Sequence, residues 1–274
     1  MKMAEKFIGV FDSGFGGLNT MRGIVRMLPQ YNYIYLGDSA RAPYGHRSKK
    51  QVYEFTTQAV DFLFKNNCEL VVLACNTASS DALRKIQKEY LPKHYPHKKV
   101  LGVLIPAVEH GVSVTKNKRI GVMATIGTVK SKAFEREMQK LDPEIKVLQQ
   151  ACPLLVPLVE EGKHNSKAAE AILKKYVSPL ADRNIDTLLL GCTHYGILEK
   201  QIKKHVGKNV QVISETNAVP SKLKDYLKRH KDIANKIGRN KKILFYSTGP
   251  ISKFEKLGSK FFGSKIKVTG VDLN

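Results

Sequence analysis

The chain has 274 residues and is 42% hydrophobic, so it is long enough to bury a substantial core in two domains. Its formal net charge is +22. The first apolar run, Phe7–Phe11, is too short for a secretory signal, and no apolar stretch approaches the roughly 18 residues that span a membrane, which predicts a cytoplasmic protein without a membrane anchor. The four cysteines form no C-x-x-C pair and no cluster with histidine, so neither a disulfide framework nor a zinc site is expected.

Short apolar runs bounded by Gly, Asn, Asp or Pro predict the strands. In chain order they are Phe7–Phe11, Tyr33–Leu36, Leu70–Ala74, Val100–Leu104, Arg119–Met123, Ile145–Leu148, Thr187–Gly191, Val210–Ile213, Lys242–Tyr246 and Lys265–Val271. Segments with helical spacing lie between most of them. This alternation predicts an α/β protein built from βαβ units, with parallel sheets covered on both faces.

The chain also shows signs of two related halves. Ile8-Gly-Val10 recurs as Ile120-Gly-Val122, at nearly the spacing that separates Cys75 from Cys192. We therefore expect two similar, doubly wound parallel-sheet lobes with the active site between them. A break in the pattern around Pro92 and Pro96, and a second near Gly207, predict a first lobe of residues 1–97 plus 208–274 and a second lobe of residues 98–207.

Two loops that directly follow predicted strands carry polar and flexible residues. The first is Asp12-Ser-Gly-Phe-Gly-Gly17, whose backbone N–H groups can approach an anion. It does not match a dinucleotide fingerprint, because Asn19 stands where a third glycine is needed, and it does not match a P-loop. A carboxylate is the better ligand, and a plain capped turn is the alternative. The second loop, Gly37–Gly45, contains a Pro-Tyr-Gly turn that could cover a polar ligand.

Cys75 and Cys192 each end a predicted strand, in Ala74-Cys-Asn-Thr77 and Gly191-Cys-Thr-His194. At a helix N-terminus a thiol's pKa is expected to fall from about 8.5 toward neutrality, so each cysteine could act as acid or base. Cys68 and Cys152 are expected to be buried without a chemical role. A cysteine phosphatase would need Arg six residues after its nucleophile, where the chain has Asp81 and Leu198. A Cys-His hydrolase using His194 would leave the second thiol without a function.

Taken together, five segments resemble the signature segments of the glutamate racemase family, in that family's order. They are Phe11–Leu18, Gly37–Gly45, Ala74–Ser79, Ala124–Val129 and Leu190–Tyr195. The resemblance implies a cofactor-independent and metal-independent isomerase that interconverts L- and D-glutamate and supplies D-glutamate for peptidoglycan. It also implies that Cys75 takes the α-proton from D-glutamate and Cys192 takes it from L-glutamate.

The same resemblance implies the supporting residues. Asp12, Glu160 and His194 would tune the thiols. The expected substrate-binding residues are Asp12, Ser13, Tyr44, Gly45, Asn76, Thr77, Thr125, Thr128, Thr193 and His194. A homodimer is also expected. The chain departs from the family pattern at Gly196, where Pro is usual, and at Ser214-Glu-Thr216, where an Asp-Ser-Ala-like stretch is usual.

Two alternatives stay open. The first is a related two-cysteine racemase acting on aspartate, although aspartate-specific relatives usually have Cys-Thr-Glu where this chain has Cys192-Thr-His194. The second is a nucleic-acid-associated protein, because 46 Lys and Arg residues face only 24 acidic ones. The basic residues are mostly lysines on helix-like segments without interleaved aromatics, which favours a solvated basic surface over a binding groove for nucleic acid.

Overall fold

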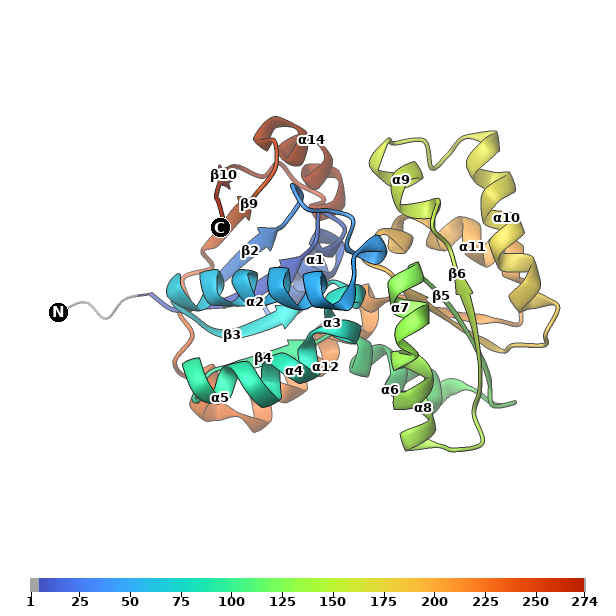
Figure 1. The fold of residues 1–274 in the computed structure, drawn as a ribbon, viewed down its shortest axis with the longest axis horizontal. Helices are drawn as coiled ribbons and strands as arrows, with labels where there is room; N and C mark the ends of the chain where they lie inside the picture. Colours follow the sequence, from blue (N-terminus) through green and yellow to red (C-terminus); the bar gives the residue numbers. More distant parts are fainter. Residues whose placement is uncertain (1–4, 274) are drawn as a thin grey trace.

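A computed structural model describes residues 5–273 and contains two lobes, each built on a parallel sheet (Figure 1). The six-stranded sheet has the order β10-β9-β2-β1-β3-β4, and the four-stranded sheet has the order β6-β5-β7-β8. The strands are β1 (Phe7–Asp12), β2 (Tyr33–Gly37), β3 (Cys68–Leu73), β4 (Lys99–Gly102), β5 (Arg119–Ala124), β6 (Lys146–Ala151), β7 (Thr187–Gly191), β8 (Gln211–Ile213), β9 (Ile243–Ser247) and β10 (Val268–Gly270). All ten predicted strands are present and every pairing is parallel, which confirms the predicted fold class.

Helices fill the connections between the strands. The α-helices are α1 (Gly17–Met27), α2 (Lys49–Lys65), α3 (Asn76–Asp81), α4 (Leu83–Lys85), α5 (Leu91–His94), α6 (Leu104–Val114), α7 (Ile126–Ser131), α8 (Ala133–Leu141), α9 (Leu155–Glu160), α10 (Lys167–Ala181), α11 (Glu199–Val206), α12 (Glu215–Arg229), α13 (Lys231–Ala234) and α14 (Ile251–Phe262). Two short 3-10 segments are η1 (Tyr44–His46) and η3 (Thr193–Leu198), and a π-helical turn is η2 (Ile86–Tyr90). None of the described helices is long and apolar enough to cross a membrane.

The central strand β1 shows why these sequences form a sheet that is buried on both faces. Successive side chains of a strand point to opposite faces. Ile8 and Val10 accordingly pack in the cluster that contains residues of α1, α12 and α14, whereas Phe7 and Phe11 pack in the cluster that contains residues of α2. Continuous apolar runs of this kind are needed because helices cover both faces of the sheet.

The predicted lobe boundaries differ from the strand pairing at both crossings. β4 pairs with β3 in the first sheet, although the boundary at residues 97 and 98 assigns it to the second lobe. β8 pairs with β7 in the second sheet, although residues from 208 onward were assigned to the first lobe. The proline-rich loop around Pro92 and Pro96 therefore precedes β4, an edge strand of the first sheet, and the chain crosses between the lobes one strand later than predicted each time.

Candidate active site

A narrow cavity of about 20 Å³ lies between the two lobes, beyond the carboxyl ends of β1, β3, β5 and β7. Ligands of open parallel sheets bind at this edge. All but two of the residues predicted for the site line this cavity: Ser13, Tyr44, Gly45, Cys75, Asn76, Thr77, Thr125, Glu160, Cys192, Thr193 and His194. Ala42, Pro43 and Val156 complete the lining. Segments far apart in the sequence thus converge on one small volume.

Cys75 is the N-cap residue of α3 and belongs to the first lobe. Its Sγ accepts a hydrogen bond from the backbone N–H of Ala78 at 3.4 Å, and its thiol lies 3.6 Å from the Oγ of Ser13. The side chain is 6% exposed, so the sulfur is buried beside the cavity. Close to it, the hydroxyls of Thr77 and Thr125 lie 3.1 Å apart and join the two lobes.

Cys192 follows β7 of the second lobe and has different neighbours. Its Sγ lies 3.9 Å from Nδ1 of His194, and Nε2 of the same ring lies 3.2 Å from Oε1 of Glu160. The histidine ring is also held by edge contacts to Phe15 and Phe261. A carboxylate, an imidazole and a thiol therefore form a chain that ends at the cavity.

Asp12 and Thr128, the two predicted residues outside the cavity lining, lie just behind it. Asp12 is fully buried, and its Oδ2 accepts the backbone N–H groups of Gly14 and Gly17 at 3.1 Å each. Its Oδ1 accepts the hydroxyl of Thr193 at 3.3 Å, so Asp12 links the glycine loop of the first lobe to the second lobe. Thr128 bonds Thr125 through their hydroxyls at 3.1 Å.

Glycine is required where the lobes meet. A Cβ added at Gly16 would lie 2.5 Å from Oγ1 of Thr193 and 2.7 Å from Nδ1 of His194. A Cβ at Gly45 would lie 2.7 Å from Cβ of Thr125. Both distances are shorter than real Cβ atoms tolerate, so the two loops can approach the second lobe only because these residues have no side chain.

The expectation that each thiol's pKa falls toward neutrality is wrong for this conformation. Burial raises the pKa of Cys75 to about 12, with a further contribution from the negative charge of Asp12. Burial also raises the pKa of Cys192 well above its ordinary value. The backbone N–H groups of Ala78 and His194 lower the two pKa values as predicted, but removing the sulfur from water has the larger effect. Cys192 precedes a 3-10 turn and not an α-helix, which provides fewer aligned dipoles.

Two carboxyl residues that touch the site were not among the predicted residues. Asp38 is fully buried and accepts the hydroxyl of Tyr44, the Nε of Arg41 at 2.7 Å and the Oγ1 of Thr248 at 2.7 Å, so it holds the cavity-lining Tyr44 in place. Glu215 bonds the side-chain amide of Asn76. Asp38 stands in the Gly37–Gly45 segment, and Glu215 is one of the residues that depart from the family pattern, so both positions carried a signal in the sequence.

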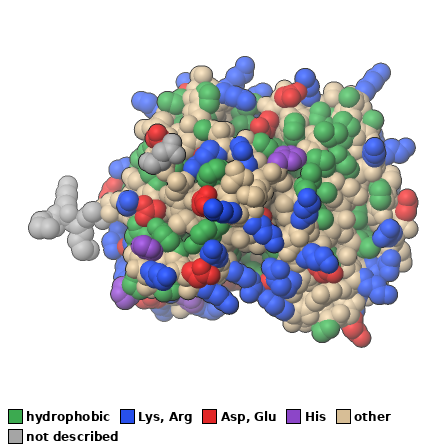
Figure 2. All heavy atoms as spheres, in the orientation of Figure 1, with side chains coloured by type: hydrophobic (Ala, Val, Ile, Leu, Met, Phe, Trp, Pro, Cys, Tyr) green, Lys and Arg blue, Asp and Glu red, His purple; other side chains and the backbone are tan. Residues whose placement is uncertain are grey.

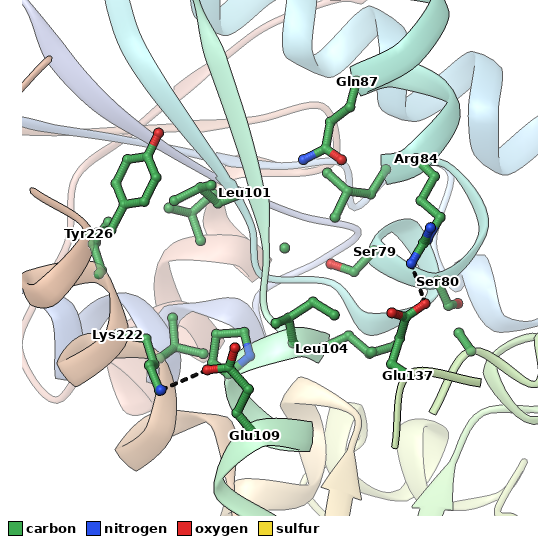
Figure 3. Close-up of a pocket in the computed structure, with 18 of the residues that line it drawn as sticks. Ser79, Ser80, Arg84, Gln87, Leu101, Leu104, Glu109, Glu137, Lys222 and Tyr226 are labelled. Carbon is green, nitrogen blue, oxygen red and sulfur yellow. Dashed lines mark hydrogen bonds and ion pairs between the residues drawn. The ribbon is translucent and has the colours of Figure 1, made fainter. Parts of the chain in front are cut away.

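A larger pocket of about 410 Å³ also lies between the lobes, but its chemistry is different (Figure 3). Its lining mixes aliphatic side chains with charged and polar ones and includes no cysteine or histidine. Ion pairs border it, among them Arg84 with Glu137 and Lys222 with Glu109, the latter at 2.7 Å. Among residues 5–273 no group of three or more His, Cys, Asp or Glu side chains is placed to hold a metal ion. The reactive groups of the described chain therefore gather at the smaller cavity.

The small cavity has the parts that proton transfer at carbon requires. One thiol reaches it from each lobe, so a molecule held between the lobes can lose a proton on one side and receive a proton on the other. Hydroxyl and amide side chains of Ser13, Asn76, Thr77 and Thr193 surround the same space. These groups can bind carboxylate and ammonium groups and stabilise negative charge that develops on a carboxylate.

Known proteins share both the sequence and this architecture. Residues 8–220 match the family model described as Asp/Glu/Hydantoin racemase. The chain is 38% identical over 264 residues to "Glutamate racemase 2" of Caldanaerobacter subterraneus, covering 96% of each chain, and 40% identical to the glutamate racemase of Enterococcus faecalis, covering 94% of this chain and 93% of that one.

Solved structures give the same result. The glutamate racemase isoform RacE1 from Bacillus anthracis superposes with a TM-score of 0.90 at 37% identity, covering 98% of both chains. The glutamate racemase from Francisella tularensis, in complex with D-glutamate, superposes with a TM-score of 0.88 at 32% identity over 98% of both chains. The protein described here therefore belongs to the Asp/Glu/hydantoin racemase family and within it is similar, over nearly its whole length, to the glutamate racemases.

Proposed function

We propose that the protein interconverts L- and D-glutamate by a two-base mechanism in which Cys75 and Cys192 are the acid and base groups. The observation that carries the proposal is that two buried cysteines, one from each lobe, line a single cavity at the carboxyl edges of the sheets. The near-complete match to glutamate racemases identifies the substrate. The D-glutamate that is formed serves peptidoglycan synthesis.

In the D-to-L direction, the thiolate of Cys75 removes the α-proton of D-glutamate, and the bond's electron pair moves into the α-carboxylate. The thiol of Cys192 then delivers its proton to the opposite face of the same carbon. The products are L-glutamate, the thiol of Cys75 and the thiolate of Cys192, and the reverse reaction begins from that state. The two cysteines therefore titrate as one coupled pair.

The raised pKa of both thiols indicates when the thiolate forms. A thiolate is costly in a buried site without a nearby positive charge. The ammonium group of bound glutamate supplies such a charge, and it lowers the pKa of the adjacent thiol. The reactive base is thus generated together with substrate binding. Backbone amides and the hydroxyls around the cavity stabilise the charge that develops on the carboxylate.

The most direct test is exchange of solvent deuterium into the α-carbon of each glutamate enantiomer. With L- or D-glutamate in heavy water, we expect the product enantiomer to carry deuterium at this carbon while the remaining substrate stays largely protonated early in the reaction. The reaction should need no added metal, pyridoxal phosphate or nucleotide. Racemisation without deuterium incorporation, or activity that disappears with a chelator, would contradict the mechanism.

Aspartate is expected to be a poor substrate. A site that pairs the distal carboxylate of glutamate leaves buried donors unsatisfied when the side chain is one methylene shorter, and this costs up to about 3 kcal/mol per group. His194 at the second cysteine also favours glutamate. A kcat/KM for aspartate equal to that for glutamate would favour the aspartate racemase alternative.

The homodimer, the cytoplasmic location and the absence of a nucleic-acid role stay predictions. Lys and Arg are spread over both lobes in Figure 2, with acidic residues between them, which supports a solvated basic surface. Sedimentation of the purified protein tests the dimer. Binding to duplex DNA that weakens steeply with salt would support the nucleic-acid alternative.

A further inference from the structure

Glu215 is a buried carboxyl residue at the point where the chain returns from the second lobe to the first. It is the first residue of α12, directly after Ser214, which follows the last strand of the second sheet. It is 4% exposed and has no lysine or arginine partner among the described ion pairs. Carboxyl groups are rarely buried without a cation unless they have a specific role.

The partner of Glu215 is a residue of the catalytic cavity. Nδ2 of Asn76, in the first lobe, donates a hydrogen bond to Oε1 of Glu215. Asn76 lines the cavity and directly follows Cys75. Its Oδ1 is buried and accepts no hydrogen bond from the described chain. A buried acceptor without a donor is unfavourable, so this oxygen is suited to a ligand that brings donors.

We propose that Glu215 is a positioning residue that holds the Asn76 amide by its nitrogen, so that the amide oxygen is left to accept a hydrogen bond from the ammonium group of the substrate beside Cys75. This inference rests on the proposed glutamate racemisation. An asparagine amide can rotate by half a turn and exchange its nitrogen and oxygen, and only the partner of one end decides which end faces the cavity. Glu215 supplies that partner.

The role requires an acceptor oxygen and does not require a charge. Burial raises the pKa of Glu215 well above its ordinary value, and the nearby Asp12 adds to the shift, which favours the neutral acid. The carbonyl oxygen of a neutral acid still accepts a hydrogen bond from Asn76. Glutamine offers the same oxygen at the same reach, whereas leucine has a similar size and no acceptor.

The test compares Glu215→Gln with Glu215→Leu in the full-length protein. We expect Glu215→Gln to keep kcat/KM for both enantiomers within about 3-fold of the wild type. We expect Glu215→Leu to lower kcat/KM by about 10- to 100-fold, mostly through a higher KM, because the ammonium contact is made in the ground state as well as in the transition state. The loss in kcat/KM has to be equal in both directions, because the equilibrium constant fixes the ratio of the two kcat/KM values.

A double-mutant cycle separates positioning from a general structural effect. In the Asn76→Ala background, Glu215→Leu should cause no further loss, because Glu215 acts through Asn76. Glu199→Gln is a matched control, since Glu199 is also the first residue of a helix but pairs with Lys203 on the surface, and it should leave activity unchanged. If Glu215→Leu does not fold, Glu215→Met replaces it, because the flexible methionine fills the same space without an acceptor oxygen.

Three results would overturn the proposal: normal kcat/KM in folded Glu215→Leu or Glu215→Met, equal impairment of Glu215→Gln and Glu215→Leu, or additive losses in the double mutant. Each differs from a failure of the proposed function, which would appear as absence of glutamate racemisation in the wild-type protein.

Discussion

The two halves of the active site use the same reactive group in unequal surroundings. Cys75 caps a helix and lies near the Ser13 hydroxyl, the backbone N–H groups of Ser13 and Ala78, and the carboxyl group of Asp12. Cys192 precedes a 3-10 turn and lies beside His194, which is bonded in turn to Glu160. Both thiols are buried, and burial raises both pKa values. The two lobes thus present the same reactive group, but the groups around each thiol differ.

Loss of either thiol should have the largest effect. Cys75→Ser and Cys192→Ser should each lower net racemisation by at least about 10³-fold in both directions, because a hydroxyl is a far weaker acid than a thiol. Rates are followed by circular dichroism of glutamate. Cys68→Ser and Cys152→Ser are the controls, since both cysteines are buried outside the cavity, and both variants should stay active. Full activity of either Cys75→Ser or Cys192→Ser would rule out the two-base mechanism.

Replacing His194 should impair mainly the direction of the reaction in which Cys192 acts as the base. His194→Asn should lower kcat in the L-to-D direction, where Cys192 is the base, about 10- to 100-fold more than in the D-to-L direction. The reason is that the variant removes the group that links Glu160 to the Cys192 thiol. The comparison has to use kcat at saturation, since the ratio of kcat/KM values is fixed by the equilibrium constant. Glu160→Gln should show the same bias to a smaller extent, and Glu161→Gln, an exposed neighbour paired with Lys163, should not. An equal loss in both directions would show that His194 serves both thiols.

Loss of the Ser13 hydroxyl should impair the Cys75 thiol and should therefore lower kcat mainly in the D-to-L direction. Ser13→Ala removes the hydroxyl 3.6 Å from the sulfur, and we expect kcat to fall about 3- to 10-fold more in the D-to-L direction. Ser80→Ala is the control, because Ser80 lies in α3, the helix that Cys75 caps, but outside the cavity lining. A larger loss in the L-to-D direction would mean that the two thiols are assigned to the wrong enantiomers.

The smallest expected effect concerns stability. Since burial raises the folded-state pKa of Glu215, the unfolded chain releases this proton first as the pH rises above about 4.5, and the folded state loses relative stability until the pH passes the folded-state pKa. Glu215→Gln has no such proton. The difference in melting temperature, variant minus wild type, should therefore grow between pH 5 and pH 8. We expect about 2 to 4 °C for each kcal/mol of folding stability that the wild type loses over this range. A constant difference across this range would show that Glu215 is ionised in the folded protein.

The sequence was sufficient for features that depend on local pattern. Apolar runs located all ten strands, and residues placed directly after strands, such as Ser13, Cys75 and Cys192, lie around one cavity because parallel strands end at a common edge. The pairing of the edge strands β4 and β8 was not predictable in this way, because an apolar strand does not indicate which sheet it joins. The thiol pKa values and the link between Glu215 and Asn76 depend on burial and on contacts between distant segments, which local pattern does not contain.

The size of the catalytic cavity has a kinetic consequence. A volume of about 20 Å³ holds roughly one water molecule, and glutamate is several times larger. The site therefore has to widen to admit each substrate molecule and to release each product, and a relative motion of the two lobes that line it would widen it. Such domain motions take microseconds to milliseconds. The frequency of opening thus sets an upper limit on turnover, and increasing solvent viscosity would slow a reaction that has reached that limit.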